Sequence, residues 1–347
     1  MKKLLAVLMA ICVVLGAAGC SGKGDSGKKD DGLSGKIVIY TSMYEDIIDD
    51  MKTALKQKFP SLEIEFFQGG SGTIQSKIAA ERDAGKMGCD ILMVAEPSYA
   101  LELKEAGILH PYQFADKDKL VFDYDAEGYW YPVRVCNMIL AYNPEKYDKA
   151  SVPQTFKAFA EDANMKGMLS MSNPLTSGTA YSSAVGLYDK YGEEYLKALA
   201  GQNVAVESGS VALAKLETGE CAEIMVLEES VLKKREEEGS KLEVIYPEDG
   251  CIPVPSPIMI IDEKVSANAN IKAAEAVEEF FLSPEGQKLI VKGWMYGVRS
   301  DFTEYPYDGI PLEQLLGNTI KVDWVKCYKQ REEMRTLFQQ YIVDAAK

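Results

Sequence analysis

Histidine is almost absent: His110 is the only one in 347 residues. It lies between a leucine and a proline just after a predicted helix, a position typical of a surface turn. Ser/His/Asp hydrolases and catalytic zinc sites place a histidine beside other reactive groups, so an isolated histidine argues against both. The seven cysteines are widely spaced and form no Cys-x-x-Cys pair, which argues against a metal cluster. We expect no cofactor and interpret most of the cysteines as small buried hydrophobic residues, although one disulfide is also compatible with the sequence.

Basic residues are outnumbered by acidic ones. The chain has 38 Lys and Arg against 53 Asp and Glu, for a net charge of −15. This balance argues against nucleic acid and anionic membrane surfaces as partners. A small anionic ligand remains compatible with it, because the backbone N–H groups at a helix start bind anions whatever the net charge.

Long apolar runs are also missing, except for residues 4–14. This run is too short for a stable transmembrane helix. Two lysines precede it and small residues follow, so we interpret 1–19 as a secretory signal peptide. The cysteine after those small residues, Cys20, is similar to the cysteine of a bacterial lipobox, which becomes lipidated. Residues 20–35 are mainly Ser, Gly, Lys and Asp and predict a disordered tether. We therefore expect an exported protein, lipid-anchored to the outer face of the cytoplasmic membrane, with plain secretion as the alternative.

Strands and helices alternate along the rest of the chain. Strand-like runs at 36–40, 62–67 and 89–95 are each followed by a helical pattern. The third run is almost continuously apolar, as in a parallel strand that is covered on both faces. The alternation indicates a doubly wound α/β fold, in which ligands bind beyond the carboxyl ends of the strands.

The turn after the second strand, residues 69–73, reads Gly-Gly-Ser-Gly-Thr. At a helix start the first N–H groups lack intrahelical partners, and small residues let an anionic or polar ligand approach them. An ordinary capped turn would have a similar sequence, and no lysine follows the glycines, so this is not a nucleotide P-loop. Residues 173–179 repeat the pattern in the second half of the chain, which indicates a divided site. The predicted ligand-binding residues lie at strand ends and helix starts: Thr41, Ser42, Ser71, Gly72, Thr73, Glu96, Ser177, Gly178, Thr179, Glu228 and Glu229.

The order of these motifs resembles that of the type II periplasmic binding proteins, the extracellular substrate-binding subunits of ABC importers. Within that group, the chain is most similar to the branch that holds ferric-ion, sugar-phosphate, polyamine or thiamine, and phosphonate binders. The resemblance covers almost the whole chain after the tether. It rests on the following segments in this order: 37–42, 69–73, 89–96, 106–109, 140–143, 173–179, 280–287 and 297–299.

The resemblance implies a two-lobe α/β fold, each lobe a mostly parallel sheet flanked by helices, with the ligand cleft at the hinge. We assign residues 36–135 plus about 256–315 to lobe 1, and 136–255 plus about 316–347 to lobe 2. A single helix is predicted over 322–346. The resemblance also implies a monomeric binding protein rather than an enzyme. Its partners would be a small-molecule ligand and the transmembrane subunits of an ABC permease.

Two classes of ligand fit the motifs. A sugar phosphate or an aminoalkylphosphonate would bind the Gly/Ser/Thr helix starts, with Glu96, Glu228 or Glu229 accepting from its hydroxyls or pairing with its amine. Ferric iron is the alternative, since the resemblance gives ferric-ion binders an acidic residue where Glu96 stands. Those proteins also carry a histidine or tyrosine where Met43 and Tyr44 stand, and adjacent tyrosines where Glu228 and Glu229 stand. We favour the phosphorylated or phosphonate solute and no metal; iron would use Glu96, Tyr44 and Glu228.

Two further interpretations concern individual charges. Arg134 or Arg299 is a candidate cation for an anionic ligand, although a hinge or surface salt bridge explains Arg134 equally well. Paired carboxylates also suggest a glycoside hydrolase that uses Glu96 and Glu228. Nothing in the sequence fixes these two at a catalytic separation, so binding is favoured. Adjacent residues on a strand face opposite ways, so at most one of Glu228 and Glu229 is expected to reach the ligand.

Overall fold

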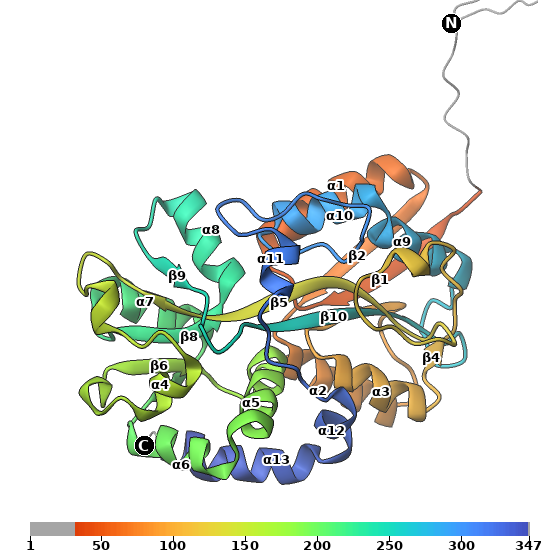
Figure 1. Ribbon diagram of the computed structural model, residues 1–347. Helices are drawn as coiled ribbons and strands as arrows, with labels where there is room; N and C mark the ends of the chain where they lie inside the picture. The colour runs from red at the N-terminus through yellow and green to blue at the C-terminus, as the bar shows by residue number, and fades with distance from the viewer. Residues whose placement is uncertain (1–31, 346–347) are drawn as a thin grey trace, which may run out of the picture. The chain divides into compact units, whose positions relative to one another are not determined.

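The computed structural model describes residues 32–345, and one ten-stranded mixed sheet runs through them. The predicted signal peptide, Cys20 and nearly all of the tether lie outside the described residues. The strand order is β2-β1-β3-β10-β5-β8-β6-β7, with β4 beside β10 and β9 beside β5 (Figure 1). The strands are β1 (Gly35–Thr41), β2 (Leu62–Gln68), β3 (Ile91–Met93), β4 (Leu109–His110), β5 (Tyr131–Tyr142), β6 (Leu169–Ser172), β7 (Ala205–Glu207), β8 (Glu223–Leu227), β9 (Glu243–Ile245) and β10 (Ile252–Ile261).

Helices flank the sheet along its whole length (Figure 1). They are α1 (Glu45–Lys58), α2 (Ser71–Asp83), α3 (Pro97–Glu105), α4 (Phe156–Glu161), α5 (Gly178–Tyr191), α6 (Glu193–Gly201), α7 (Gly209–Thr218), α8 (Glu228–Glu238), α9 (Ile271–Leu282), α10 (Pro284–Lys292), α11 (Leu312–Leu316), α12 (Trp324–Lys329) and α13 (Arg331–Phe338). Short 3₁₀ turns are η1 (Lys117–Lys119), η2 (Lys149–Ser151) and η3 (Ala163–Met165), and a π-helical turn, η4 (Gln339–Val343), follows α13.

The sheet is parallel toward each end and antiparallel in the middle. Strand β1 pairs in parallel with β2 and β3, and β6 pairs in parallel with β7 and β8. The long strands β5 and β10 pair antiparallel with each other and join the two ends. We call the end with β1–β4 lobe 1 and the end with β6–β9 lobe 2. The predicted α/β class with a mostly parallel sheet in each lobe is confirmed, but the lobes share one continuous sheet.

Each lobe has its own hydrophobic clusters, and β5 contributes to both lobes. Every residue of β5 is buried. Tyr131 and Val133 belong to the main cluster of lobe 1, whereas Met138 and Leu140 belong to that of lobe 2. Continuous burial explains why this twelve-residue strand crosses between the lobes without a loop.

The single helix predicted over 322–346 is wrong, because the chain divides there into α12 and α13. The backbone at Gln330 leaves the helical region, with φ −109° and ψ 20°. Helix α12 packs on α3 of lobe 1, while Met334 and Phe338 of α13 belong to the main cluster of lobe 2. The break thus lets one segment contact both lobes.

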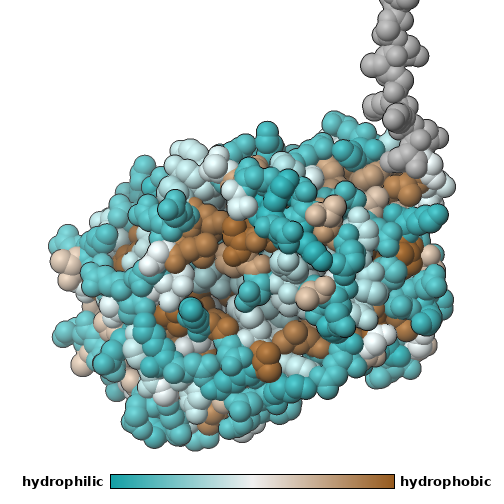
Figure 2. Space-filling view, turned by 45° about the vertical axis from the view of Figure 1, so that its right-hand side comes forward, coloured by the Kyte–Doolittle hydropathy of each residue, from teal (hydrophilic) through white to brown (hydrophobic). Residues whose placement is uncertain are grey.

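Hydrophilic residues cover most of the face in Figure 2, and apolar residues form separate patches among them. Within residues 32–345, no helix combines the length and apolar character needed to cross a membrane.

Candidate functional site

A cleft of about 740 Å³ has lining residues from both lobes and from β5. A volume of this size suits a small organic solute. The starts of four helices, α2, α5, α7 and α8, contribute to its wall. The polar lining residues are Ser42, Tyr44, Gln68, Ser71 and Thr73 before or within lobe 1 helices, Arg134 on β5, and Ser172, Asn173, Thr176, Ser177, Thr179, Glu207, Ser208, Ser210, Glu229, Ser230, Lys233, Lys234 and Glu238 from lobe 2.

Capping residues explain why several of these helices begin at the cleft. Ser177 precedes α5 and accepts a hydrogen bond from the backbone N–H of Ala180 at 3.3 Å. Ser208 precedes α7 and accepts from the N–H of Val211 at 3.4 Å. Each cap satisfies one of the first N–H groups of its helix and leaves others without an intrahelical partner. The first turns of both helices line the same cleft, so their positive dipole ends lie at its wall.

The structure brings six of the predicted ligand-binding residues to the cleft wall. The remaining five, Thr41, Gly72, Glu96, Gly178 and Glu228, are absent from the lining. The six that line it are Ser42, Ser71, Thr73, Ser177, Thr179 and Glu229.

Gly72 and Gly178 lie where the two lobes touch. The N–H of Gly72 donates to the carbonyl oxygen of Thr176 at 3.3 Å, and a Cβ on Gly72 would lie 2.7 Å from that oxygen. A Cβ on Gly178 would lie 2.9 Å from the Cβ of Glu96. These glycines therefore permit close contact between the starts of α2 and α5.

Glu96 forms a buried ion pair instead of lining the cleft. It is 2% exposed, and its Oε1 lies 2.6 Å from Nη2 of Arg331 at the start of α13. Gln75 donates to its other oxygen at 2.6 Å, and the hydroxyl of Ser98 donates to Oε1 at 2.9 Å. The carboxylate therefore already has a cation and two further donors.

Glu228 and Glu229 are adjacent at the start of α8 but face different surroundings. Glu228 is completely buried and accepts from Asn137 at 2.6 Å, Tyr246 at 2.5 Å and Tyr296 at 2.8 Å. Burial raises its pKa. Glu229 lines the cleft, and burial raises its pKa to about 7, opposed in part by the charge of Arg134. Only one of the two carboxyls is thus placed to meet a ligand.

The residues considered for iron are not gathered around one point. Glu96 is held by Arg331, and Glu228 is held by two tyrosines and an asparagine outside the cleft wall. Tyr44 does line the cleft, but its hydroxyl is hydrogen-bonded to that of Ser230 at 2.5 Å and burial raises its pKa. Among residues 32–345, no group of three or more His, Cys, Asp or Glu is arranged to hold a metal. Glu96 and Glu228, the pair considered for a glycoside hydrolase, are both absent from the cleft lining.

Some lining residues were not among the predicted ligand contacts. Ser208 and Ser210 follow β7 in the sequence Glu-Ser-Gly-Ser, so the strand-end pattern used for the other helix starts also applies to them. Lys233 lies one turn into α8, and no local pattern distinguishes it from the other charges of that helix.

Comparisons with known proteins agree with this architecture. Residues 89–308, more than half of the chain, match the family described as bacterial extracellular solute-binding protein. An uncharacterized protein of Haemophilus influenzae is 25% identical over 300 residues, which is 82% of each chain.

Two solved structures illustrate the shared fold. The periplasmic binding protein AfuA from Actinobacillus pleuropneumoniae, with exogenous fructose-6-phosphate bound, is 21% identical, with a TM-score of 0.77 over 89% of this chain and 98% of that one. Iron-bound HitA from Pseudomonas aeruginosa is 20% identical, with a TM-score of 0.74 over 88% of this chain and 99% of that one. At these identities the similarity shows the fold and leaves the ligand open. The family match and the fold confirm the resemblance to type II substrate-binding proteins of ABC importers, and the chain belongs to the bacterial extracellular solute-binding proteins.

Proposed function

We propose that this protein is the lipid-anchored substrate-binding subunit of an ABC importer, with a phosphorylated or phosphonate organic solute as its ligand. A sugar phosphate or an aminoalkylphosphonate is the favoured class. The observation that carries the proposal is the convergence of four helix starts from both lobes on one cleft.

These helix starts suit a tetrahedral oxyanion. Each adds backbone N–H donors and partial positive charge, and phosphate and phosphonate oxygens are strong acceptors for both. Hydroxyl groups supplement them from both lobes, for example Ser71 and Thr73 on α2 and Ser177 and Thr179 at α5. A cleft of about 740 Å³ also leaves room for more than the oxyanion. Glu229 and Asn173 in the same wall can accept from hydroxyl or ammonium groups on the remainder of the ligand.

The charges of the site favour this class over ferric iron. Glu96 would have to leave Arg331 before it could bind a metal, and a buried ion pair is costly to break. Tyr44 would have to lose a phenolic proton whose pKa is raised by burial. An oxyanion needs neither change, because its donors are already at the cleft wall.

Capture would use the two-lobe construction. Hinge bending in the segments that cross between lobes is a common way to close such a cleft around a ligand. Strands β5 and β10 are the crossing segments here, since they pair with each other at the centre of the sheet and join its two ends. The closed complex would then be recognised by the permease. In this motion, the two bodies that move relative to each other would be lobe 1, residues 36–135 plus about 256–315, and lobe 2, residues 136–255 plus about 316–347.

A thermal-shift panel tests the proposal. It would contain sugar phosphates, aminoalkylphosphonates, inorganic phosphate, polyamines, thiamine and Fe³⁺. A true ligand at 100 times its Kd should stabilise the protein by about 2.7 kcal/mol. A shift with Fe³⁺ alone, together with a coloured tyrosinate complex, would refute the phosphate assignment and establish the iron alternative.

Variants at the two facing helix starts locate the site. Ser71→Ala and Thr179→Ala should each weaken the phosphorylated ligand without lowering the melting temperature of the free protein. Ser61→Ala, at an exposed turn, is the control and should bind normally. Unchanged affinity in both cleft variants would place the ligand elsewhere.

A further inference from the structure

Arg134 is a buried cation at the cleft wall, and no carboxylate of residues 32–345 forms an ion pair with it. It lies on β5, is 2% exposed and contributes to the cleft wall. Its Nη2 donates to the hydroxyl of Ser42 at 2.9 Å, and its Nη1 lies 2.9 Å from the sulfur of Met295. Its Nε has no hydrogen-bond partner among residues 32–345. In the described part of the chain, the guanidinium thus donates hydrogen bonds only to neutral groups.

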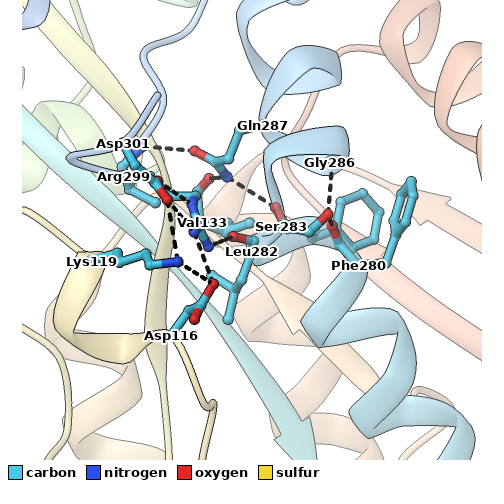
Figure 3. Close-up of polar contacts among 12 residues, drawn as sticks. Asp116, Lys119, Val133, Phe280, Leu282, Ser283, Gly286, Gln287, Arg299 and Asp301 are labelled. Carbon is cyan, nitrogen blue, oxygen red and sulfur yellow. Dashed lines mark hydrogen bonds and ion pairs between the residues drawn. The ribbon is translucent and has the colours of Figure 1, made fainter. Parts of the chain in front are cut away.

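A second buried arginine, Arg299, is neutralised by carboxylates, as buried charges usually are. Arg299, also 2% exposed, lies in lobe 1 and does not line the cleft. Figure 3 shows its contacts with Asp116, Leu282 and Asp301. Its Nε bonds Asp301 at 2.7 Å, its Nη2 bonds Asp116 at 3.0 Å, and its Nη1 donates to the carbonyl of Leu282 at 3.0 Å. Every nitrogen of Arg299 has a partner. In the described part of the chain, Arg134 forms no ion pair and its Nε forms no hydrogen bond.

The other cations of the cleft wall are paired. Lys233 bonds Asp46 across the lobes, and Lys234 bonds Glu217 at 2.9 Å and Glu238 at 2.8 Å. Glu229 is close enough to interact electrostatically with Arg134 but forms no ion pair with it. Within residues 32–345, Arg134 is therefore the one lining cation without an ion-pair partner.

An unpaired buried charge is unfavourable, and a counter-ion relieves the penalty. We propose that Arg134 is the charge-selecting residue of the cleft, and that the anionic group of the solute binds it as the counter-ion that the protein lacks. Ser42 holds the guanidinium in place through its hydrogen bond. This inference rests on the proposed function and names the residue that distinguishes a phosphorylated solute from its neutral parent. Helix starts alone attract neutral polar groups as well as anions, so they give less discrimination of charge.

The first experiment needs no ligand and compares matched arginine variants. Arg134→Gln should melt at or above the wild-type temperature, because it removes a charge that has no partner. Arg299→Gln should melt several degrees lower, because it breaks two ion pairs. If Arg134→Gln lowers the melting temperature as much as Arg299→Gln does, Arg134 is structural and the inference is overturned.

The second experiment measures charge selection by calorimetry with fructose 6-phosphate, inorganic phosphate and fructose. Arg134→Gln should weaken fructose 6-phosphate roughly 10- to 100-fold, change any fructose binding by less than about threefold, and be partly rescued by Arg134→Lys. The inference is overturned if Arg134→Gln binds fructose 6-phosphate as tightly as the wild type does, or if its affinities for fructose 6-phosphate and fructose fall by the same factor. Neither result contradicts the proposed function. If the wild-type protein binds neither fructose 6-phosphate nor inorganic phosphate, and Fe³⁺ raises its melting temperature, then both this inference and the proposed function are overturned.

Discussion

The carboxyl group of Glu229 should make stability depend on pH in a direction opposite to that of ordinary surface carboxylates. Glu229 is 2% exposed, and burial raises its pKa from 4.5 to about 7. Native Glu229 therefore keeps its proton over a pH range in which the unfolded chain has lost it. Its contribution to stability is fully present below about pH 4.5 and is lost as the pH rises through about 7.

The size of the effect follows from the same shift. A change from 4.5 to about 7 corresponds to about 3 kcal/mol of unfolding free energy once both states are ionised. Glu229→Gln keeps the shape of the protonated acid and removes the titration. The variant should match the wild type near pH 4.5 and be more stable by up to about 3 kcal/mol at pH 8.5.

Urea unfolding at half-unit steps from pH 4.5 to 8.5 measures this difference. Glu223 and Glu278 are also buried with raised pKa values, but they titrate alike in both proteins and cancel in the comparison. Glu333→Gln, the same substitution at an exposed position of α13, is the matched control. A difference between Glu229→Gln and wild type that stays constant across the range would refute the reasoning.

Three further predictions concern stability. Gly72→Ala should lower the free energy of unfolding in urea by about 1–3 kcal/mol, because the new Cβ would lie 2.7 Å from a backbone oxygen of the facing lobe. The control Gly70→Ala should not, because no atom lies within 4 Å of its Cβ, and equal effects of the two variants would contradict the contact at Gly72. Glu96→Gln should lose about 3–5 kcal/mol by leaving Arg331 unpaired, and a double-mutant cycle with Arg331→Met that shows no coupling would argue against the pair. Asp90→Ala should cost at least about 2 kcal/mol, since its carboxylate accepts one backbone and two side-chain hydrogen bonds; a smaller loss by thermal unfolding would show that water replaces them.

Local patterns in the sequence were sufficient for the fold class. Alternating strand and helix signals, with the apolar run at 89–95, predicted parallel strands covered by helices, and β1, β2 and β3 pair in that way. The shared central sheet could not be predicted in the same way, because β5 and β10 pair across more than a hundred residues of sequence. The register of these two strands depends on tertiary packing and shifts between Ser256 and Pro257. No short sequence motif encodes that register.

The candidate site shows the same division. Ser71, Thr73, Ser177 and Thr179 could be identified because helix starts have a local signature of small and hydroxyl residues. The ion pair between Glu96 and Arg331 could not be predicted, because Arg331 lies on α13, far from Glu96 in the sequence. No local pattern around either residue indicates its partner.

The difference in pairing between Arg331 and Arg134 connects these observations. Arg331 neutralises Glu96, the carboxylate that a metal site would need, whereas Arg134 in the cleft wall forms no ion pair with any carboxylate of residues 32–345. Cation binding would therefore require breaking an existing ion pair and adding positive charge beside an unpaired guanidinium. Anion binding requires neither and relieves an unfavourable charge. Under the proposal, the charge preference of the cleft would depend on which arginine is paired with a carboxylate, Arg331 rather than Arg134. The helix-start motifs alone do not determine that pairing.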